Sequence, residues 1–161
     1  MNPPGIQIVQ AVSPEDLATA ANLFRAYAEA LGVDLCFQDF AAELADLPGK
    51  YAPPRGALLL ARGADGQALG CVALRPAPHL AGGCEMKRMY VAPAARGLGL
   101  GRALAAAVIG AARQAGYQRM VLDTLPSLSA ALALYADLGF VRIAAYYDTP
   151  IAETVFLQLT L

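Results

Sequence analysis

Three charged residues, Glu85, Lys87 and Arg88, lie within four consecutive positions of a strand predicted over 84–91. The strand precedes a crossover helix, so we expect it in the middle of a sheet, where charge is costly to bury unless it is paired or faces a wet cleft. Strand alternation assigns one set of side chains to each face: Glu85, Lys87, Met89 and Val91 against Met86, Arg88 and Tyr90. The strand therefore predicts a polar cavity at its surface.

The residues that follow read "PAARGLGLGRAL" and lead into an alanine-rich helix predicted over 100–115. Ordering glycine costs conformational entropy, so three glycines before a helix need a reason. A helix N-terminus leaves backbone N–H groups unpaired and carries partial positive charge, and glycines let an anion approach closely. The segment predicts a backbone cradle for a phosphate group.

The glycine spacing selects among phosphate-binding motifs. The dinucleotide pattern GxGxxG and the GxxxxGK[ST] loop both require glycine where Arg102 stands. The pattern that fits is R-x-x-G-x-G, from Arg96 to Gly101. The alternative is a glycine-rich surface turn without a ligand.

Composition limits the class of protein. The chain has 161 residues and a net charge of −1, which indicates one domain without an electrostatic footprint for nucleic acid. No apolar run is long enough to span a membrane, and no secretory signal is visible. The three cysteines have no CxxC spacing and the single histidine is His79. We therefore expect a cytoplasmic protein with reduced thiols, no metal site and no membrane partner.

The pattern of helix and strand signals predicts the order β-α-α-β-β-β-α-β-α-β-β. Before the charged strand come a strand over 6–12, helices over 14–31 and 40–47, and strands over 57–61 and 68–74. After the glycine-rich helix come a strand over 120–124, a helix over 127–138 and strands over 140–144 and 155–159. This order describes one α/β domain with a mixed sheet.

Three motifs resemble those of the GNAT superfamily of acyl-CoA N-acyltransferases. R-x-x-G-x-G resembles its pyrophosphate-binding motif, residues 134–140 its "LYxxLGF", and residues 85–91 the "ExKRxYV" strand of many bacterial members. Leu128 departs from the asparagine often found at its position. The resemblance implies a GNAT-like single domain over 1–161, with its core from about residue 6. It also implies a mixed, mostly antiparallel sheet of about seven strands flanked by about four helices.

The resemblance further implies an N-acetyltransferase that moves an acetyl group from acetyl-CoA to a primary amine, by direct attack in a ternary complex and without a metal. The amine belongs to a small molecule or a peptide, and the enzyme is a monomer or a homodimer. Specificity is expected from the first two helices and the loop 149–154. The implied cofactor-binding residues are Met89, Tyr90, Val91, Arg96, Gly97, Leu98, Gly99, Leu100, Gly101 and Arg102.

Catalytic roles follow from the same resemblance. Tyr135 matches the usual general acid, although its spacing also suits an amphipathic core residue. Glu85 matches a general base that acts directly or through water; its alternative is a structural partner of Lys87 or Arg88. The backbone N–H of Met89 is an expected oxyanion donor. Asp123, at a strand end, is a candidate for binding the amine or for capping a turn.

Two non-enzymatic functions stay open at this stage. The chain could be a regulatory acyl-CoA-binding module in which Glu85 and Tyr135 are only structural, or an interaction protein that uses the fold to present a surface. Slow thiol release with every amine would indicate the first, and failure to bind CoA the second.

Overall fold

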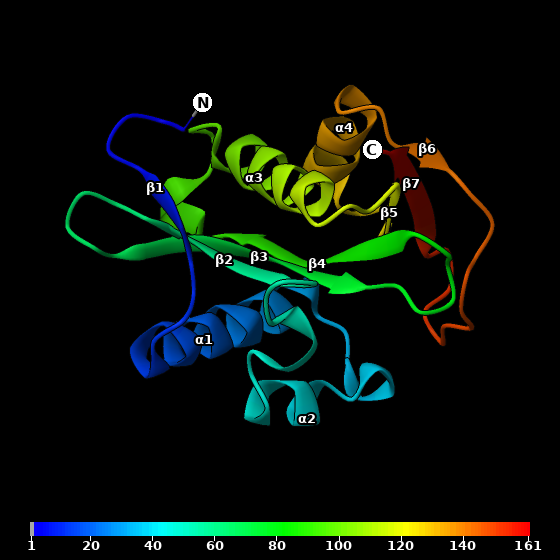
Figure 1. The fold of residues 1–161 in the computed structure, drawn as a ribbon, viewed down its shortest axis with the longest axis horizontal. Coiled ribbons are helices and arrows are strands. Elements are labelled where there is room, and N and C mark those ends of the chain that lie inside the picture. Colours follow the sequence, from blue (N-terminus) through cyan, green and yellow to red (C-terminus); the bar gives the residue numbers. More distant parts are fainter. Residues whose placement is uncertain (1) are drawn as a thin grey trace.

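The computed structural model describes residues 2–161 (Figure 1). The order of helices and strands is the predicted one, with short 3-10 turns at Cys36–Gln38, Gly49–Tyr51 and Pro93–Ala95. The elements are β1 (Gln7–Gln10), α1 (Pro14–Leu31), α2 (Phe40–Ala45), β2 (Ala57–Arg62), β3 (Ala68–Pro76), β4 (Gly83–Val91), α3 (Leu100–Gln114), β5 (Arg119–Thr124), α4 (Ser129–Asp137), β6 (Val141–Arg142) and β7 (Val155–Thr160).

The seven strands form one sheet in the order β1-β2-β3-β4-β5-β7-β6. All neighbours are antiparallel except β4 and β5, which are parallel and are connected through α3. β4 is the fourth of the seven strands, which confirms the central position expected for the charged strand. The mixed, mostly antiparallel sheet with four α-helices confirms the predicted fold class.

The helices cover both faces of the sheet, α1 and α2 on one side and α3 and α4 on the other (Figure 1). Each side has its own core because strand residues alternate between the faces. Leu58 and Leu60 of β2 pack in the cluster that contains Phe24 of α1. Leu59 belongs to the cluster that contains Leu104 of α3. The two cores hold the central strand between them.

β4 contains a bulge that the sequence analysis did not predict. Ala73 of β3 pairs with Lys87 and Cys71 pairs with Tyr90, so two residues of β4 stand opposite Val72 alone. The bulge is at Arg88, whose φ of 58° lies in the left-handed region. One extra residue therefore shifts the alternation of side chains along the second half of β4.

The shift corrects the predicted faces of β4. Lys87 and Arg88 are consecutive, yet both side chains reach Gln38, on the side of the sheet that α1 and α2 cover. Met89 instead packs against the core on the α3 side, together with Met86. Strict alternation is wrong beyond Lys87, because it does not allow for the bulge. The result is a larger concentration of charge on one face.

β4 and β5 pair over only a short length. Their parallel ladder joins Gly83–Glu85 to Arg119–Val121, whereas β4 continues to Val91 and β5 to Thr124. Beyond Glu85 the two strands separate. This opening, next to the bulge, is where the cavities of the molecule meet.

Candidate functional site

A groove of about 570 Å³ lies at the N-terminus of α3. Gly97 and Gly99 in the preceding loop have φ values of 80° and 81°, a conformation that glycine adopts without strain. In the part of the chain that the structure describes, no side chain caps α3, and the first hydrogen bond of the helix runs from the Ala103 N–H to the Gly99 carbonyl. The first backbone N–H groups of the helix are therefore free to bind an anion.

Arg96 links the glycine-rich loop to the end of β4 through a hydrogen bond. Its Nε donates to the Val91 carbonyl at 3.1 Å, and its guanidinium carbon lies 5.9 Å from the centre of the Tyr90 ring. Eight of the ten predicted cofactor-binding residues line the groove. The exceptions are Leu98, whose side chain is exposed, and Arg102, which forms a surface ion pair with Asp137.

A cavity of about 70 Å³ lies where β4 and β5 separate; we call it the junction. Met89, Asp123 and Tyr135 line it, so the structure brings three predicted site residues together. The junction shares Tyr27, Met89, Leu128, Ala131 and Tyr135 with the groove. It shares Gln38, Lys87 and Arg88 with a third cavity on the opposite side. The three spaces are therefore neighbours, with the junction between the groove and the polar side of β4.

Tyr135 extends from α4 to the boundary between the groove and the junction. Its ring packs edge-on against Phe140 at 5.5 Å between centres, and its side chain is buried. Among residues 2–161 its hydroxyl forms no hydrogen bond. Burial raises the pKa of Tyr135 above its ordinary value, so the hydroxyl keeps its proton through the physiological range.

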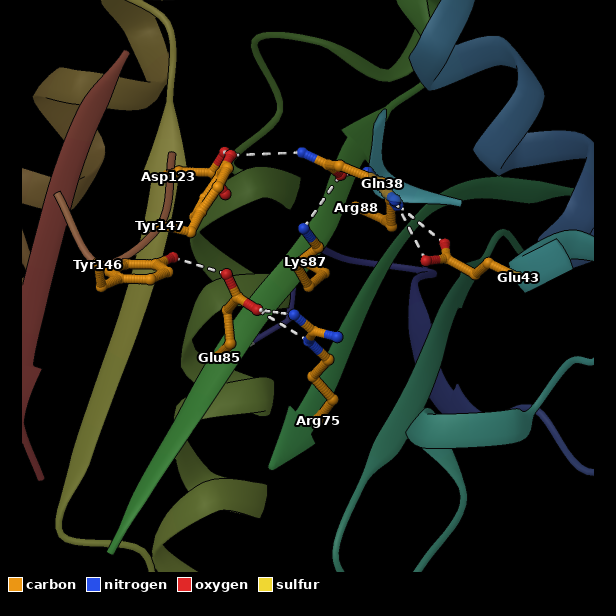
Figure 2. Close-up of polar contacts among 9 residues, drawn as sticks. All are labelled: Gln38, Glu43, Arg75, Glu85, Lys87, Arg88, Asp123, Tyr146 and Tyr147. Carbon is orange, nitrogen blue, oxygen red and sulfur yellow. Dashed lines mark hydrogen bonds and ion pairs between the residues drawn. The ribbon is translucent and has the colours of Figure 1, made fainter. Parts of the chain in front are cut away.

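The third cavity, about 460 Å³, is polar and lies on the α2 side of β4; we call it the polar pocket (Figure 2). Three buried charged residues of β4 line it, Glu85, Lys87 and Arg88. The prediction of a polar cavity at this strand is therefore confirmed. The other walls come from the segment 37–51, from Arg75 and His79, and from residues 146–148.

Glu85 is 1% exposed and both of its oxygens are bonded (Figure 2). Arg75 donates to Oε1 through Nε at 2.8 Å and Nη2 at 2.7 Å, and the Tyr146 hydroxyl donates to Oε2 at 2.6 Å. Burial alone would raise the pKa of Glu85, but the nearby cations Lys87 and Arg75 and these hydrogen bonds hold it below its ordinary value. Glu85 is thus a carboxylate bound to Arg75, and it lines the polar pocket without lining the junction.

This ion pair gives a pH-dependent prediction for stability. Glu85→Gln is expected to lower the free energy of unfolding by about 2 kcal/mol at pH 7, less than the ~3–5 typical of a fully buried pair because Arg75 retains some water. The folded pKa of Glu85 is lowered, so the difference is present above the ordinary glutamate pKa of about 4.3 and disappears as the pH falls through the folded value. Urea denaturation of both proteins between about pH 7 and 3 measures it. A constant difference across this range would contradict the assignment.

Arg88 is held by a second ion pair on the same face. Its Nε and Nη2 donate to the Glu43 carboxylate at 2.9 and 3.1 Å, and its guanidinium carbon lies 5.0 Å from the centre of the Phe40 ring. Its Nη1 donates to Gln38 Oε1 at 2.9 Å, and Lys87 Nζ donates to the same oxygen at 3.1 Å. α2 and the preceding 3-10 turn therefore supply the partners of the bulged strand.

The segment before β7 completes the site. The Tyr147 hydroxyl donates to Asp123 Oδ2 at 2.6 Å and accepts a long hydrogen bond from Gln38 Nε2 at 3.5 Å. Tyr146 stacks on His79, with 4.8 Å between ring centres. Tyr146 and Tyr147 lie just before the loop 149–154 that was predicted to determine specificity, so the sequence analysis did not identify these two residues of the pocket wall. The sequence feature that could have identified them is the pair of adjacent tyrosines between the last two strands.

Within residues 2–161 no group of three or more His, Cys, Asp or Glu side chains could hold a metal ion. In the same range, no helix has the length and apolar character required to cross a membrane. All three cysteines carry free thiols, and Cys71 and Cys84 are buried.

Residues 20–140 match the family model described as "Acetyltransferase (GNAT) family". The chain therefore belongs to the GNAT acetyltransferase family. An uncharacterized N-acetyltransferase of Schizosaccharomyces pombe is 43% identical over 159 residues, covering 99% of this chain and 97% of that protein. The recognition made from the motifs is confirmed, and the protein is an acyltransferase.

Solved structures show the same fold. A Klebsiella pneumoniae protein assigned to the acyl-CoA N-acyltransferases is 30% identical, with a TM-score of 0.69 and coverage of 97% of this chain and 96% of that one. A Salmonella typhimurium protein assigned as an acetyltransferase, solved with its cofactor acetyl-CoA, is 24% identical, with a TM-score of 0.67 and coverage of 97% and 94%.

Proposed function

We propose that this protein transfers the acetyl group of acetyl-CoA to a primary amine, which attacks the thioester directly in a ternary complex. The observation that carries the proposal is the junction, which shares lining residues with the groove at the N-terminus of α3 on one side and with the polar pocket on the other. We infer that acetyl-CoA occupies the groove, that the amine comes from the polar pocket, and that the two meet where β4 and β5 separate. The Salmonella neighbour with acetyl-CoA and the relatives named N-acetyltransferases support the choice of donor and reaction.

Acetyl-CoA would bind along the groove. Its pyrophosphate is placed at the free N–H groups of α3, where the helix dipole favours negative charge. Its pantetheine arm would run beside the second half of β4, where Met89 and Val91 line the groove and can pair with it like an added strand. This placement brings the thioester to the junction, next to Tyr135.

The reaction then needs three groups. Asp123 holds the ammonium of the substrate in the junction, and the ammonium loses a proton to water in the polar pocket. The free amine attacks the carbonyl carbon and forms the C–N bond of a tetrahedral intermediate, whose oxyanion accepts a hydrogen bond from the Met89 N–H. As the carbonyl forms again, the C–S bond breaks and Tyr135 gives its proton to the departing thiolate. The nitrogen loses its second proton to water, which leaves the amide and free CoA, and the Tyr135 phenolate recovers a proton from water.

Glu85 would act as the base only through an intervening water. Both of its oxygens are bonded and it does not line the junction, so no direct contact with the attacking amine is available. Its lowered pKa also makes it a weak proton acceptor. These contacts favour a second form of the proposal, in which Glu85 positions Arg75 and Tyr146.

A panel of amines scored by release of free CoA tests the function as a whole. Turnover with at least one amine is expected. If the protein binds acetyl-CoA but releases CoA with none of them, a non-catalytic acyl-CoA-binding module is the better assignment.

Gly101→Val tests the groove. A Cβ at Gly101 would stand 3.7 Å from Leu134 and 3.9 Å from Val91, ordinary contacts, so the fold is expected to accept it. The branched side chain would occupy space needed by the cofactor, and overlap of ~1–3 kcal/mol weakens acetyl-CoA binding by about tenfold or more. Calorimetric titration measures this affinity.

Gly110→Val is the matched control for this variant. Gly110 lies in the same helix, a Cβ there meets nothing within 4 Å, and the residue does not line the groove. Its affinity for acetyl-CoA is expected to match that of the unmodified protein. Gly99 is less suitable for this test, because its positive φ strains any branched side chain. Equal affinities for both folded variants would show that the cofactor binds elsewhere.

A further inference from the structure

The polar pocket contains three buried or half-buried cations, of which two have carboxylate partners. Arg75 is paired with Glu85, and Arg88 with Glu43. Lys87 is 9% exposed and forms no ion pair with any residue in 2–161. Burial lowers the pKa of Lys87, partly offset by the more distant charges of Glu85 and Asp123. The structure therefore holds one buried ammonium group without a carboxylate in contact.

Two cationic donors converge on a neutral acceptor at this point. Lys87 Nζ and Arg88 Nη1 lie 3.1 and 2.9 Å from the same amide oxygen, Oε1 of Gln38 (Figure 2). A carboxylate oxygen would accept the same two hydrogen bonds and would add the attraction of its negative charge for both cations. Gln38 lies on the short 3-10 turn Cys36–Gln38, outside the sheet. The position of its amide oxygen is thus one that a carboxylate would occupy more favourably.

A charge of opposite sign also lines the junction. Asp123 and Lys87 both line this cavity of about 70 Å³, and among the described residues Asp123 Oδ2 accepts a hydrogen bond only from the Tyr147 hydroxyl. The inner charges balance, with Arg75, Lys87 and Arg88 against Glu43, Glu85 and Asp123. This arrangement suits a molecule with one positive and one negative group a few atoms apart. A phosphate dianion fits less well, because the exposed lining of the polar pocket has one lysine, Lys50, and three carboxylates, Asp39, Asp46 and Asp148.

We propose that the acyl acceptor is a free amino acid, whose carboxylate is held by Lys87 and Arg88 and whose amine is held at Asp123. This inference rests on the proposed acetyl transfer and narrows its substrate class. A carboxylate at Lys87 supplies the missing partner of the buried ammonium, and the short span of the junction places the amine beside Met89 and Tyr135. The lysine side chain of a peptide or a polyamine has no anion near its amine and would leave Lys87 unpaired.

Matched substrates test the inference. We would measure kcat/KM by release of free CoA for a panel of L-amino acids and for their α-carboxamides, which have the same shape without the negative charge. The free acid is expected to be preferred by about tenfold or more, the effect of one charge pair in a desolvated site. The carboxamides have the more acidic ammonium and thus more free amine at neutral pH, so a preference for the acid must come from binding.

Two variants remove the carboxylate site in different ways. Lys87→Met keeps the length of the side chain without the charge, and it is expected to lower kcat/KM for the acid about tenfold more than for the carboxamide. Gln38→Glu retains both cations but places a carboxylate of the protein between them. Like Lys87→Met, Gln38→Glu is expected to reduce the preference for the acid. Because Gln38 lies on a turn outside the sheet, Gln38→Glu is expected to fold even if Lys87→Met does not.

The outcomes separate the inference from the function on which it rests. Turnover of acids and carboxamides with similar kcat/KM would overturn the amino-acid assignment and leave acetyl transfer intact. Equal losses for both substrates in Lys87→Met, with the preference unchanged in Gln38→Glu, would overturn the carboxylate site. Absence of turnover with every acid, every carboxamide and every simple amine, despite acetyl-CoA binding, would overturn the transfer reaction itself.

Discussion

Tyr135→Phe is expected to lower kcat by about 10²-fold or more while the affinity for acetyl-CoA stays nearly the same. The substitution removes only the hydroxyl, and the ring retains its edge-on contact with Phe140. The departing thiolate is the conjugate base of a thiol with a pKa of about 8.5, so a proton donated as it leaves prevents it from attacking the carbonyl carbon again. The raised pKa of Tyr135 keeps the hydroxyl available as a donor across the working range. Steady-state kinetics with calorimetric binding measure both effects.

Tyr117→Phe is the matched control for Tyr135→Phe, because it also removes a buried tyrosine hydroxyl. Tyr117 lies beyond the other end of α3 and donates to the Arg55 carbonyl at 2.6 Å. Its substitution is expected to cost about 1 kcal/mol of stability and to leave kcat unchanged. A thioester with a more acidic thiol should partly restore Tyr135→Phe. If Tyr135→Phe turns over at the normal rate when chemistry is limiting, the residue is a core residue and the acid is another group.

Glu85→Gln is expected to reduce kcat/KM by about 10²-fold, with a loss that stays constant from about pH 7 to 9.5. Removing this charge leaves Arg75 without its carboxylate and changes the bond that orients Tyr146 in the polar pocket. Because the carboxylate has a lowered pKa, it is fully ionised over this range, and the cost of losing it does not depend on pH. A pH–rate profile of both proteins measures the result.

The same profile distinguishes the two proposed roles of Glu85. If Glu85 removes the ammonium proton through water, the loss should shrink as the pH rises and the amine loses its proton unaided. Asp16→Asn serves as a control, since Asp16 pairs with Arg62 at 2.6 Å and lines none of the three cavities. It is expected to retain normal kinetics at every pH.

The sequence predicts most of the fold because each element has a local signal. The longest helix begins after Ser13, whose hydroxyl accepts from the Asp16 N–H at 3.0 Å, and it ends at Gly32 with a φ of 67°. Both signals are visible in the sequence. The strand predicted over 140–144 is shorter than expected, only Val141–Arg142, and Val141 is largely exposed. At an edge of the sheet, β-propensity alone does not extend a strand.

The sequence predicts which residue types form the site, but it does not predict which side chains form ion pairs there. The charges of β4 indicate a polar cavity, and the glycines before α3 indicate a groove. The pairing of Glu85 with Arg75 depends on the register between β3 and β4, and that of Arg88 with Glu43 depends on the bulge. Tyr146 and Tyr147 reach the site through a segment without regular structure. Neither the register between two strands nor the path of a loop produces a periodic pattern in the sequence, so these features could not be predicted from it.

The short ladder between β4 and β5 makes the sheet two half-sheets joined at one end. Strands β1 to β4 form one half and β5 to β7 the other, and the ladder that connects them joins Gly83–Glu85 to Arg119–Val121. A ligand bound between β4 and β5 would contact both half-sheets beyond the end of their backbone pairing. Ligand at a hundredfold above its Kd stabilises a folded chain by about 2.7 kcal/mol. Acetyl-CoA bound between the two half-sheets is therefore expected to raise the free energy of unfolding of both halves together.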